Sequence, residues 1–436
     1  MKKELTPGSN VAVIGSGVAG IVSAYLLDRS QRYRVTLFEA DSRLGGHTST
    51  VVIKRGEDEG LAVDTGFIVL NDRTYPLFTE FLNQLAVPIR SSDMSFSFED
   101  RESGFVFAGT TLNGLFAQRM NLFSPKFYQL LGEIMRFGKE GQHFLRNSDS
   151  SANPTLREFV EAGRYSNFMR DCYLLPISAA IWSAPLSTIL DFPARSFLSF
   201  FSNHGLLSLR HRPVWQTVVN GSHQYLKAFA RKFSGTIKLD SRVVSIARAM
   251  EEVAGSNTSQ IVTTANGERQ EFDAVIIAAH ADQALRMLKD PSLAEQSLLG
   301  SWRYQRNDVV LHTDKRQLPN NRRAWASWNY IREQDADAAA AVSVTYHMNR
   351  LQGLKSKKEY CVTLNAPQRI AEEEVVTSFV YEHPVYDARS VATQPKLAEL
   401  QGVDNRYFCG SYFGYGFHED AVRSAVEMAR LLGVQL

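Results

Sequence analysis

The sequence predicts an α/β protein of two domains, one of them built around a parallel sheet. The chain has 436 residues, more than a single hydrophobic core usually holds. Residues 10–48 follow the order strand, glycine-rich turn, helix and strand, which is typical of a parallel sheet. Apolar strand-like segments at 272–279 and 407–411 indicate that distant parts of the chain return to the same domain.

The glycine-rich turn has the spacing of a phosphate-binding loop. A short buried strand is expected at 11–14, and Gly15, Gly17 and Gly20 follow as G-x-G-x-x-G. The first glycine permits a tight turn, the second allows close approach of a pyrophosphate, and the third lets helix pack on strand. A helix over 18–27 would point its free N–H groups at the phosphates.

An acidic residue follows at the distance that a ribose contact requires. The second strand, 35–38, ends at Glu39, roughly twenty residues beyond the last glycine. A carboxylate in that position accepts hydrogen bonds from an adenosine ribose. Strand, turn, helix and acid together predict dinucleotide binding, and a turn that binds no phosphate is the alternative.

A second glycine pair indicates which dinucleotide binds. In the segment 41–48, Gly45 and Gly46 stand beside Arg43, a cation suited to phosphate. This Arg-x-Gly-Gly run resembles the second fingerprint of the flavin-containing amine oxidase and phytoene desaturase superfamily. The family often has arginine directly after the glycines, where this chain has His47. The resemblance implies FAD rather than a nicotinamide dinucleotide.

Composition excludes several classes of function. A net charge of +2 gives no field that would attract nucleic acid. The three cysteines, Cys172, Cys361 and Cys409, fit no metal spacing and suit a reducing compartment. The first strand begins near residue 11, which leaves no room for a cleaved signal, and no apolar run reaches about 18 residues. We expect a cytoplasmic protein, peripheral at most to the inner membrane face, without a metal.

The next segments lead out of the first domain. Residues 61–67 resemble the superfamily's Asp-x-Gly element near the flavin, with Asp64 and Gly66 as the matching residues, although a plain strand and turn is the alternative. A helix is expected over 75–90, and the alternating phenylalanines of 94–108 predict a hairpin.

Residues 115–146 combine apolar residues at helical spacing with interleaved arginines and lysines. Such a helix either lies on an anionic bilayer or buries its apolar face in a core with the cations in solvent. A surface loop is expected at 147–154, and further helices are expected over 155–212.

The chain then returns to the first domain. A strand at 214–219, a turn and a helix over 222–233 precede an extended segment at 237–248. The superfamily holds the adenine on the backbone of such a strand, here at Val243 and Val244. A hairpin partner at 261–270 and the buried strand at 272–279 follow. Strands expected at 308–312, 325–330 and 341–348 would form the antiparallel floor of a substrate domain.

The C-terminal segment resembles the superfamily's flavin motif, in which a strand ends in Gly-Asp and a helix N-terminus lies under the flavin. Gly410 matches the glycine, and Ser411 takes the place of the acid. A helix beginning at His418 would stabilise negative charge on the reduced ring. Phe417 takes the place of an aromatic cage residue and is expected to form a flavin-facing wall.

The resemblance implies a glutathione-reductase-like Rossmann fold that binds FAD, with a discontinuous substrate domain of antiparallel sheet plus helices. The FAD-binding domain would comprise 1–74, 214–295 and 400–436, and the substrate domain 75–213 and 296–399. FAD is expected to be non-covalent, because Cys409 lies within the strand before Gly410. The cofactor-binding residues that the resemblance implies are Gly15, Gly17, Ala19, Gly20, Glu39, Ala40, Arg43, Gly45, Gly46, His47, Asp64, Thr65, Gly66, Val243, Val244, Gly410, Ser411, Glu419, Asp420, Ala421 and Val422.

The superfamily includes amine oxidases and carbon–carbon desaturases, both of which pass a hydride to the flavin. Amine oxidases typically carry a lysine on the strand that here spans 307–311, and this segment has none. The segments 325–330, 346–347 and 414–420 resemble a bacterial branch often associated with cyclopropane-fatty-acyl-phospholipid synthases. That resemblance implies a lipid acyl substrate and such a synthase as a partner.

Removal of a weakly acidic proton from an acyl chain needs a base near the flavin. His312, His347 and Glu419 are the candidates, because they lie at strand ends or at the start of the last helix, although each is equally a candidate structural residue. The sequence therefore favours an FAD-dependent dehydrogenase of acyl chains. An amine oxidase and a non-catalytic FAD-binding partner of a lipid-modifying enzyme are the alternatives.

Overall fold

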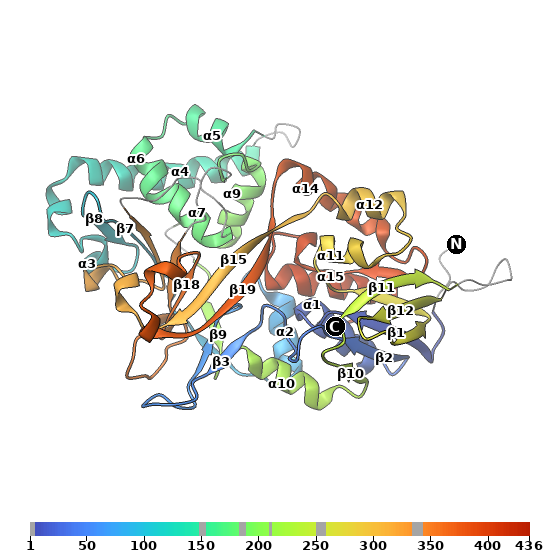
Figure 1. Cartoon of the computed structure of the whole chain (residues 1–436). Coiled ribbons are helices and arrows are strands. Elements are labelled where there is room, and N and C mark those ends of the chain that lie inside the picture. The colour runs from blue at the N-terminus through green and yellow to red at the C-terminus, as the bar shows by residue number, and fades with distance from the viewer. Residues whose placement is uncertain (1–4, 148–153, 183–188, 209–211, 250–258, 334–342) are drawn as a thin grey trace.

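The computed structural model describes residues 5–147, 154–182, 189–208, 212–249, 259–333 and 343–436. A five-stranded sheet in which every pair is parallel forms one side of the molecule (Figure 1). Its strands, in spatial order, are β10 (Thr236–Lys238), β2 (Tyr33–Phe38), β1 (Ser9–Ile14), β14 (Ala274–Ile277) and β20 (Arg406–Phe408). The predicted glycine turn thus follows the central strand.

Helices cover one face of this sheet and a small antiparallel sheet covers the other. On the first face lie α1 (Val18–Arg29), α2 (Pro76–Gln84), α10 (His223–Lys232) and α15 (His418–Leu431), which share one apolar core. On the second face lies the antiparallel sheet of β11 (Val243–Arg248), β12 (Gln260–Thr264) and β13 (Arg269–Phe272). Because both faces are covered, the residues of β1 and β14 are apolar almost without interruption.

A seven-stranded sheet forms the other side of the molecule, and all its pairs are antiparallel except the pair of β16 and β7. Its strands, in spatial order, are β19 (Val375–Val385), β15 (Arg303–His312), β18 (Cys361–Leu364), β17 (Val344–His347), β16 (Trp328–Arg332), β7 (Phe96–Asp100) and β8 (Phe105–Ala108). The long strands β15 and β19 extend from this sheet toward the parallel one (Figure 1).

A helical layer packs on the seven-stranded sheet through an aromatic core, and smaller elements join the two sides. The helices of that layer are α4 (Pro125–Asn147), α5 (Leu156–Ala162), α6 (Asn167–Met169), α7 (Leu175–Trp182) and α9 (Ala194–Asn203). The smaller strands are β3 (Thr50–Val52), β4 (Ala62–Asp64), β5 (Val69–Asn71), β6 (Ile89–Ser91) and β9 (Trp215–Val218). The remaining helices are α3 (Leu112–Leu115), α11 (Ala281–Met287), α12 (Leu293–Leu299), α13 (Met348–Leu351) and α14 (Ala388–Thr393).

The structure confirms the parallel sheet, the hairpin of β7 and β8 and the antiparallel floor, and it corrects three element boundaries. The helix expected over 75–90 ends at Gln84, because Ala86 takes a left-handed φ of 55° and the chain enters β6. The segment 237–248 is not one strand, since a left-handed turn at Asp240 separates β10 from β11.

The third correction concerns the amphipathic segment 115–146. Its long helix, α4, begins only at Pro125, after a 3₁₀ turn at Arg119–Phe123. Proline suits the first turn of a helix, where its missing N–H costs nothing. Most of the loop expected at 147–154 lies outside the described residues, and the residue ranges of the two domains stay a prediction.

Candidate cofactor and substrate site

A cavity of about 1270 Å³ lies between the two large sheets and extends from the glycine turn to the helical layer. At Gly15 and Gly20 the turn has no room for a side chain. A Cβ atom on Gly20 would lie 1.8 Å from the carbonyl oxygen of Gly15. A Cβ atom on Gly46 would lie 3.3 Å from the Cα atom of Gly17, so the two glycine segments touch. This is a backbone cradle of the kind that binds a diphosphate.

Glu39 organises the cradle from the end of β2. Its buried carboxylate accepts hydrogen bonds from the backbone N–H of Ser16 and of Asp41, each at 2.9 Å, and from the Ser16 hydroxyl. The Glu39 side chain lines the cavity, and a carboxylate has about four acceptor positions. One acceptor position therefore remains for a ribose hydroxyl, and the residues present fit the adenosine end of FAD.

Most of the predicted cofactor residues line the same cavity. At the glycine turns and the two ends of the cavity these are Gly15, Gly17, Ala19, Glu39, Ala40, Arg43, Gly45, Gly46, His47, Thr65, Gly66, Val243, Val244, Gly410, Ser411 and Ala421. The wall continues through Phe417 at the N-terminus of α15, where the positive end of a helix dipole faces inward. Their contacts with FAD stay a prediction.

Five predicted cofactor residues do not line the cavity. Gly20 serves the packing of α1 on β14, and Val422 lies in the core of the parallel sheet. Asp420 accepts the N–H groups of Tyr415 and Phe417 and thereby shapes the turn before α15. The other two, Asp64 and Glu419, are carboxylates bound within the protein itself.

Asp64 is a buried structural acceptor. It accepts hydrogen bonds from the backbone and hydroxyl of Ser222, from the Thr50 hydroxyl and from the Gln352 amide. Burial raises its pKa to about 7. These contacts join β4 to the start of α10, while its neighbours Thr65 and Gly66 line the cavity. The resemblance assigned the element to the flavin, and only its second half reaches the cavity.

Asp64→Ala is therefore expected to lower the free energy of unfolding by about 3 kcal/mol, because it leaves several buried donors without an acceptor. Urea denaturation followed by tryptophan fluorescence measures the change. Asp64→Asn, which keeps one acceptor oxygen, should lose less. An Asp64→Ala midpoint equal to that of the unmodified protein would contradict this structural role.

The three predicted bases do not line the cavity, and each has hydrogen-bond partners elsewhere in the protein. The His312 Nε2 lies 2.7 Å from the Thr363 hydroxyl, and its Nδ1 accepts the N–H of Asp314 at 3.1 Å. Burial lowers the His312 pKa to about 4. Glu419 accepts the N–H groups of Leu77 and Phe78 and so caps the N-terminus of α2.

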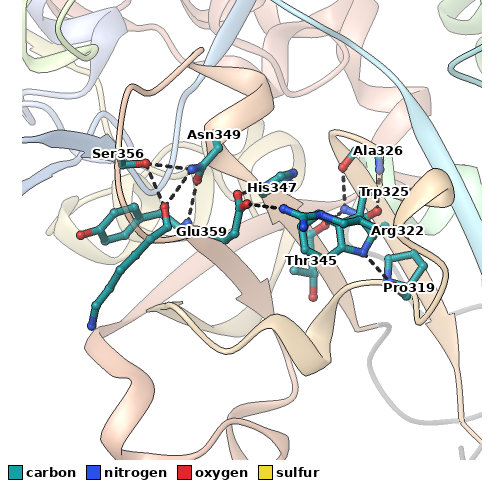
Figure 2. Close-up of polar contacts among 12 residues, drawn as sticks. Pro319, Arg322, Trp325, Ala326, Thr345, His347, Asn349, Ser356 and Glu359 are labelled. Carbon is teal, nitrogen blue, oxygen red and sulfur yellow. Dashed lines mark hydrogen bonds and ion pairs between the residues drawn. The ribbon is translucent and has the colours of Figure 1, made fainter. Parts of the chain in front are cut away.

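His347, the last residue of β17, belongs to a polar network (Figure 2). Its Nε2 lies 2.8 Å from the Glu359 carboxylate, which also pairs with Arg322 at 3.4 Å. The Arg322 guanidinium lies over the Trp325 ring. None of the three predicted bases therefore reaches the cavity. A residue at the end of a strand or helix can direct its side chain into an internal polar network as readily as into a site.

The structure instead places other histidines at the cavity. His204 follows α9, and its Nδ1 donates to the Phe200 carbonyl at 2.9 Å, which leaves Nε2 as an acceptor. Its ring stacks on Phe200, and the Phe417 ring centroid lies 5.6 Å away. Burial lowers its pKa to about 4, so the imidazole is neutral at pH 7. No role was predicted for His204 from the sequence.

Four further histidines line the wall near the glycine turn. His418 stacks on Phe67, and its Nε2 lies 3.0 Å from the Thr48 hydroxyl. The others are His47, His280 and His383. No local signal in the sequence could bring His383, on the strand β19, next to a glycine turn more than 300 residues earlier.

The end of the cavity beyond Phe417 is aromatic and apolar. Its described walls carry no carboxylate, since the carboxylates lining the cavity are Glu39 and Asp41 at the glycine turn and Glu382 beside His280. Among the described residues of this end, Arg212 is a cation that lines it. The apolar and aromatic residues of this wall are Phe96, Phe107, Tyr173, Ile177, Ile181, Trp182, Phe200, Leu206, Trp215, Trp328 and Tyr346.

Cys409 does not line the cavity. Its thiol is buried, with the Ser23 hydroxyl 3.5 Å from Sγ, and burial raises its pKa to about 12. A thiol in that position is no nucleophile for the flavin, in agreement with non-covalent binding. In the part of the chain that the structure describes, no helix has the length and apolar character needed to cross a bilayer.

Comparison with known proteins places this site in a family. The model of the flavin containing amine oxidoreductases matches residues 18–360. An L-amino-acid oxidase from Siganus canaliculatus is 24% identical over 306 residues, which cover 66% of this chain and 53% of that protein. The chain thus spans about half the length of the curated relatives that it matches.

Solved structures share the fold over the whole chain. A CLA-producing fatty acid isomerase from P. acnes has a TM-score of 0.68 at 14% identity, covering 97% of this chain and 98% of its own. A putrescine oxidase variant also has a TM-score of 0.68 at 14% identity, covering 98% and 100%. The match of the family model over most of the chain shows that the protein belongs to the flavin-containing amine oxidoreductases.

Proposed function

We propose that the protein dehydrogenates a carbon–carbon bond in a lipid acyl chain. The observation that carries this proposal is the aromatic end of the cavity. None of the described residues that line this end is a carboxylate. Such walls bind methylene groups by burying them and offer no anion to an ammonium group. FAD, when bound, supplies the two-electron acceptor for this chemistry.

The residues of this chain would position the acyl chain and accept its proton. Phe200 and Phe417 stack with ring centroids 4.8 Å apart and form a flat wall beside the predicted flavin position. His204 adjoins both rings. Its Nε2 carries no proton and can therefore accept one from the substrate as a general base. We therefore assign the base role to His204 in place of His312, His347 and Glu419.

Oxidation of an amino acid is the second candidate, and Arg212 is the observation that favours it. Arg212 lines the aromatic end of the cavity, where a guanidinium can bind a substrate carboxylate. The same cation would also bind the carboxylate or phosphate of a lipid, so Arg212 alone does not separate the two substrates. The aromatic and apolar residues of the wall favour the lipid.

Anaerobic bleaching of the flavin separates these candidates. We expect acyl lipids to reduce the flavin and expect each added two-carbon unit to tighten binding about tenfold until the cavity is full. Amines and L-amino acids should leave the flavin oxidised. The absorbance of oxidised flavin is followed after mixing with phospholipids, free acyl chains, polyamines, aryl amines or L-amino acids. Rapid bleaching by an amine or amino acid, with no response to any acyl lipid, would replace this proposal by the amine oxidase.

We also propose that the protein takes its substrate from a membrane surface through an exposed apolar patch. The patch comprises Leu112, Met120 and Phe123, which are 77%, 70% and 79% exposed. Arg119 and Lys126 flank it, as cations that suit anionic lipid head groups. The cavity wall reaches Gly109, three residues before Leu112. The partnership with a cyclopropane-fatty-acyl-phospholipid synthase is supported by the sequence resemblance alone.

The patch predicts binding to anionic vesicles. Phe123→Glu should abolish co-sedimentation with vesicles of phosphatidylcholine and phosphatidylglycerol, because it places a charge where an apolar ring would enter the bilayer. Leu293→Glu is the matched control, since Leu293 on α12 is 84% exposed and lies away from the patch (Figure 1). Equal vesicle binding by both variants, or no binding by the unmodified protein, would contradict the membrane proposal.

A further inference from the structure

Three imidazole rings from distant segments meet at one place in the cavity wall. The His47 ring centroid lies 5.9 Å from that of His280 and 5.4 Å from that of His383. His47 follows the second glycine pair, His280 follows β14, and His383 lies on β19 of the other sheet. All three line the cavity, and the Tyr381 ring lies 5.0 Å from His47. We call these three residues the histidine cluster.

The histidine cluster lies beside the diphosphate cradle. His47 directly follows Gly46, and a Cβ atom on Gly46 would touch Gly17. A Cβ atom on Gly15 would lie 2.7 Å from the carbonyl oxygen of Ala278, two residues before His280. Two of the three rings are therefore carried by segments in direct contact with the glycine turn.

Nitrogen atoms of the cluster lack hydrogen-bond partners within the part of the chain that the structure describes. The His47 Nε2 and the His280 Nδ1 are both buried without one, and the nearest carboxylate oxygen to the latter, of Glu382, is 3.7 Å away. The His383 Nδ1 lies 3.1 Å from the amide nitrogen of Asn307, so its Nε2 carries the proton. Buried polar atoms are normally paired, and unpaired ones lining a cavity indicate a polar ligand.

The ligand is an anion rather than a metal ion. Among the described residues, no group of three or more histidine, cysteine, aspartate or glutamate side chains has the arrangement of a metal site. Each imidazole nitrogen beside the cradle can instead carry a proton and donate to a phosphate oxygen. The cluster thus matches the diphosphate of the FAD that the glycine turns cradle.

We propose that the histidine cluster binds the diphosphate of FAD and takes up one proton as it does so, which makes FAD affinity depend on pH. The proposal rests on FAD binding and is independent of the substrate. Arg43, whose guanidinium donates to the carbonyl groups of Gly46 and Thr48, lines the same cavity and adds a cation beside the cradle.

Burial keeps the cluster neutral until an anion arrives. It lowers the His47 pKa well below 6.5, the charges of His383, His280 and His418 lower it further, and a hydrogen bond with the Glu382 backbone opposes them. Burial lowers the His383 pKa to about 4, and a positive charge on His280 would lower it further.

The groups facing His280 shift its pKa in opposite directions. Burial lowers its pKa, Asp282 and Glu382 raise it, and Arg286 lowers it. Tyr304, which stacks on His280, stays neutral because burial raises its pKa. A diphosphate within reach favours the protonated cluster and raises the pKa values on binding.

The sign of the pH dependence follows from this uptake. At a pH between the pKa of the free cluster and that of the FAD complex, binding consumes one proton, so affinity falls as the pH rises. The loss is up to about tenfold per pH unit in that window. Affinity is insensitive to pH below and above the window.

The experiment follows FAD release from the holoenzyme. Protein is diluted serially between pH 5.5 and 8.5, and the fluorescence of released FAD gives the dissociation constant. We expect the constant to rise by at least tenfold across this range. His47→Arg, which supplies a permanent charge, should bind FAD with a pH-independent constant. His143→Gln is the matched control, because His143 is exposed on α4 and does not line the cavity, and it should keep the full dependence.

A second measurement needs no variant. Histidine ¹⁵N NMR shifts of the unmodified holoenzyme should show a protonated imidazole at pH 7, one that becomes neutral when FAD is released. A pH-independent dissociation constant for the unmodified protein would overturn the proposal. So would an unchanged pH dependence in His47→Arg, or holoenzyme spectra in which every cavity histidine is neutral at pH 5.5.

Discussion

His204→Gln is expected to slow flavin reduction by an acyl lipid by about 10²–10⁴-fold, the usual contribution of a general base. The substitution removes the nitrogen that would accept the substrate proton and leaves the glycine turns untouched. FAD content should therefore stay unchanged. Anaerobic stopped-flow absorbance measures the rate, and bound flavin measured after gel filtration shows that the cofactor site is intact.

The pH profile of the same reaction gives a second test. Burial lowers the His204 pKa to about 4, so the base is competent above that pH and is lost as the pH falls through it. Reduction of the unmodified protein should be insensitive to pH from 5 to 9. His312→Gln is the matched control, since His312 is buried but does not line the cavity, and it should reduce at the normal rate. A rate lost in His312→Gln and kept in His204→Gln would reverse the assignment.

Glu39→Ala is expected to weaken FAD binding at least tenfold. It removes a charge-assisted hydrogen bond to the ribose, worth roughly 1.5–3 kcal/mol, and a factor of ten in affinity corresponds to about 1.4 kcal/mol. It also frees the N–H groups of Ser16 and Asp41, which Glu39 holds at 2.9 Å. Flavin content after dialysis, read from the absorbance ratio, measures the loss.

Two variants sharpen the Glu39 prediction. Glu39→Gln keeps one acceptor oxygen and should lose less flavin than Glu39→Ala. Asp41→Ala removes an exposed carboxylate from the same wall without removing any acceptor of the Ser16 hydrogen bonds, and it should retain FAD. If Glu39→Ala keeps its full flavin content after dialysis, the ribose binds elsewhere.

The sequence by itself determined the cofactor end of the site. The strand β1, the turn from Gly15 to Gly20 and the helix α1 are consecutive, so their spacing alone sets where a diphosphate can lie. Glu39 ends the neighbouring strand, and β1 and β2 pair in parallel, so its position follows from strand length. These relations are local, and the structure shows all of them.

Only the tertiary structure decided which polar side chains face the cavity. His312, His347 and Glu419 occupy plausible strand and helix ends, but Thr363, Glu359 and the N-terminus of α2 engage them elsewhere. The position of a residue at an element's end does not specify the direction of its side chain, because distant partners compete for each hydrogen-bonding group. The same limit applies to Asp64.

Two histidines that do line the cavity could not be predicted from the sequence either. His204 comes from the helical layer and His383 from β19, and neither has a neighbour in the sequence that belongs to the glycine turns. Their convergence depends on how the seven-stranded sheet packs against the parallel one, an arrangement set by long-range contacts between apolar surfaces that no local spacing encodes. The sequence thus determined the glycine cradle that is predicted to hold FAD, and the packing of the two sheets decided which imidazoles line the cavity beside it.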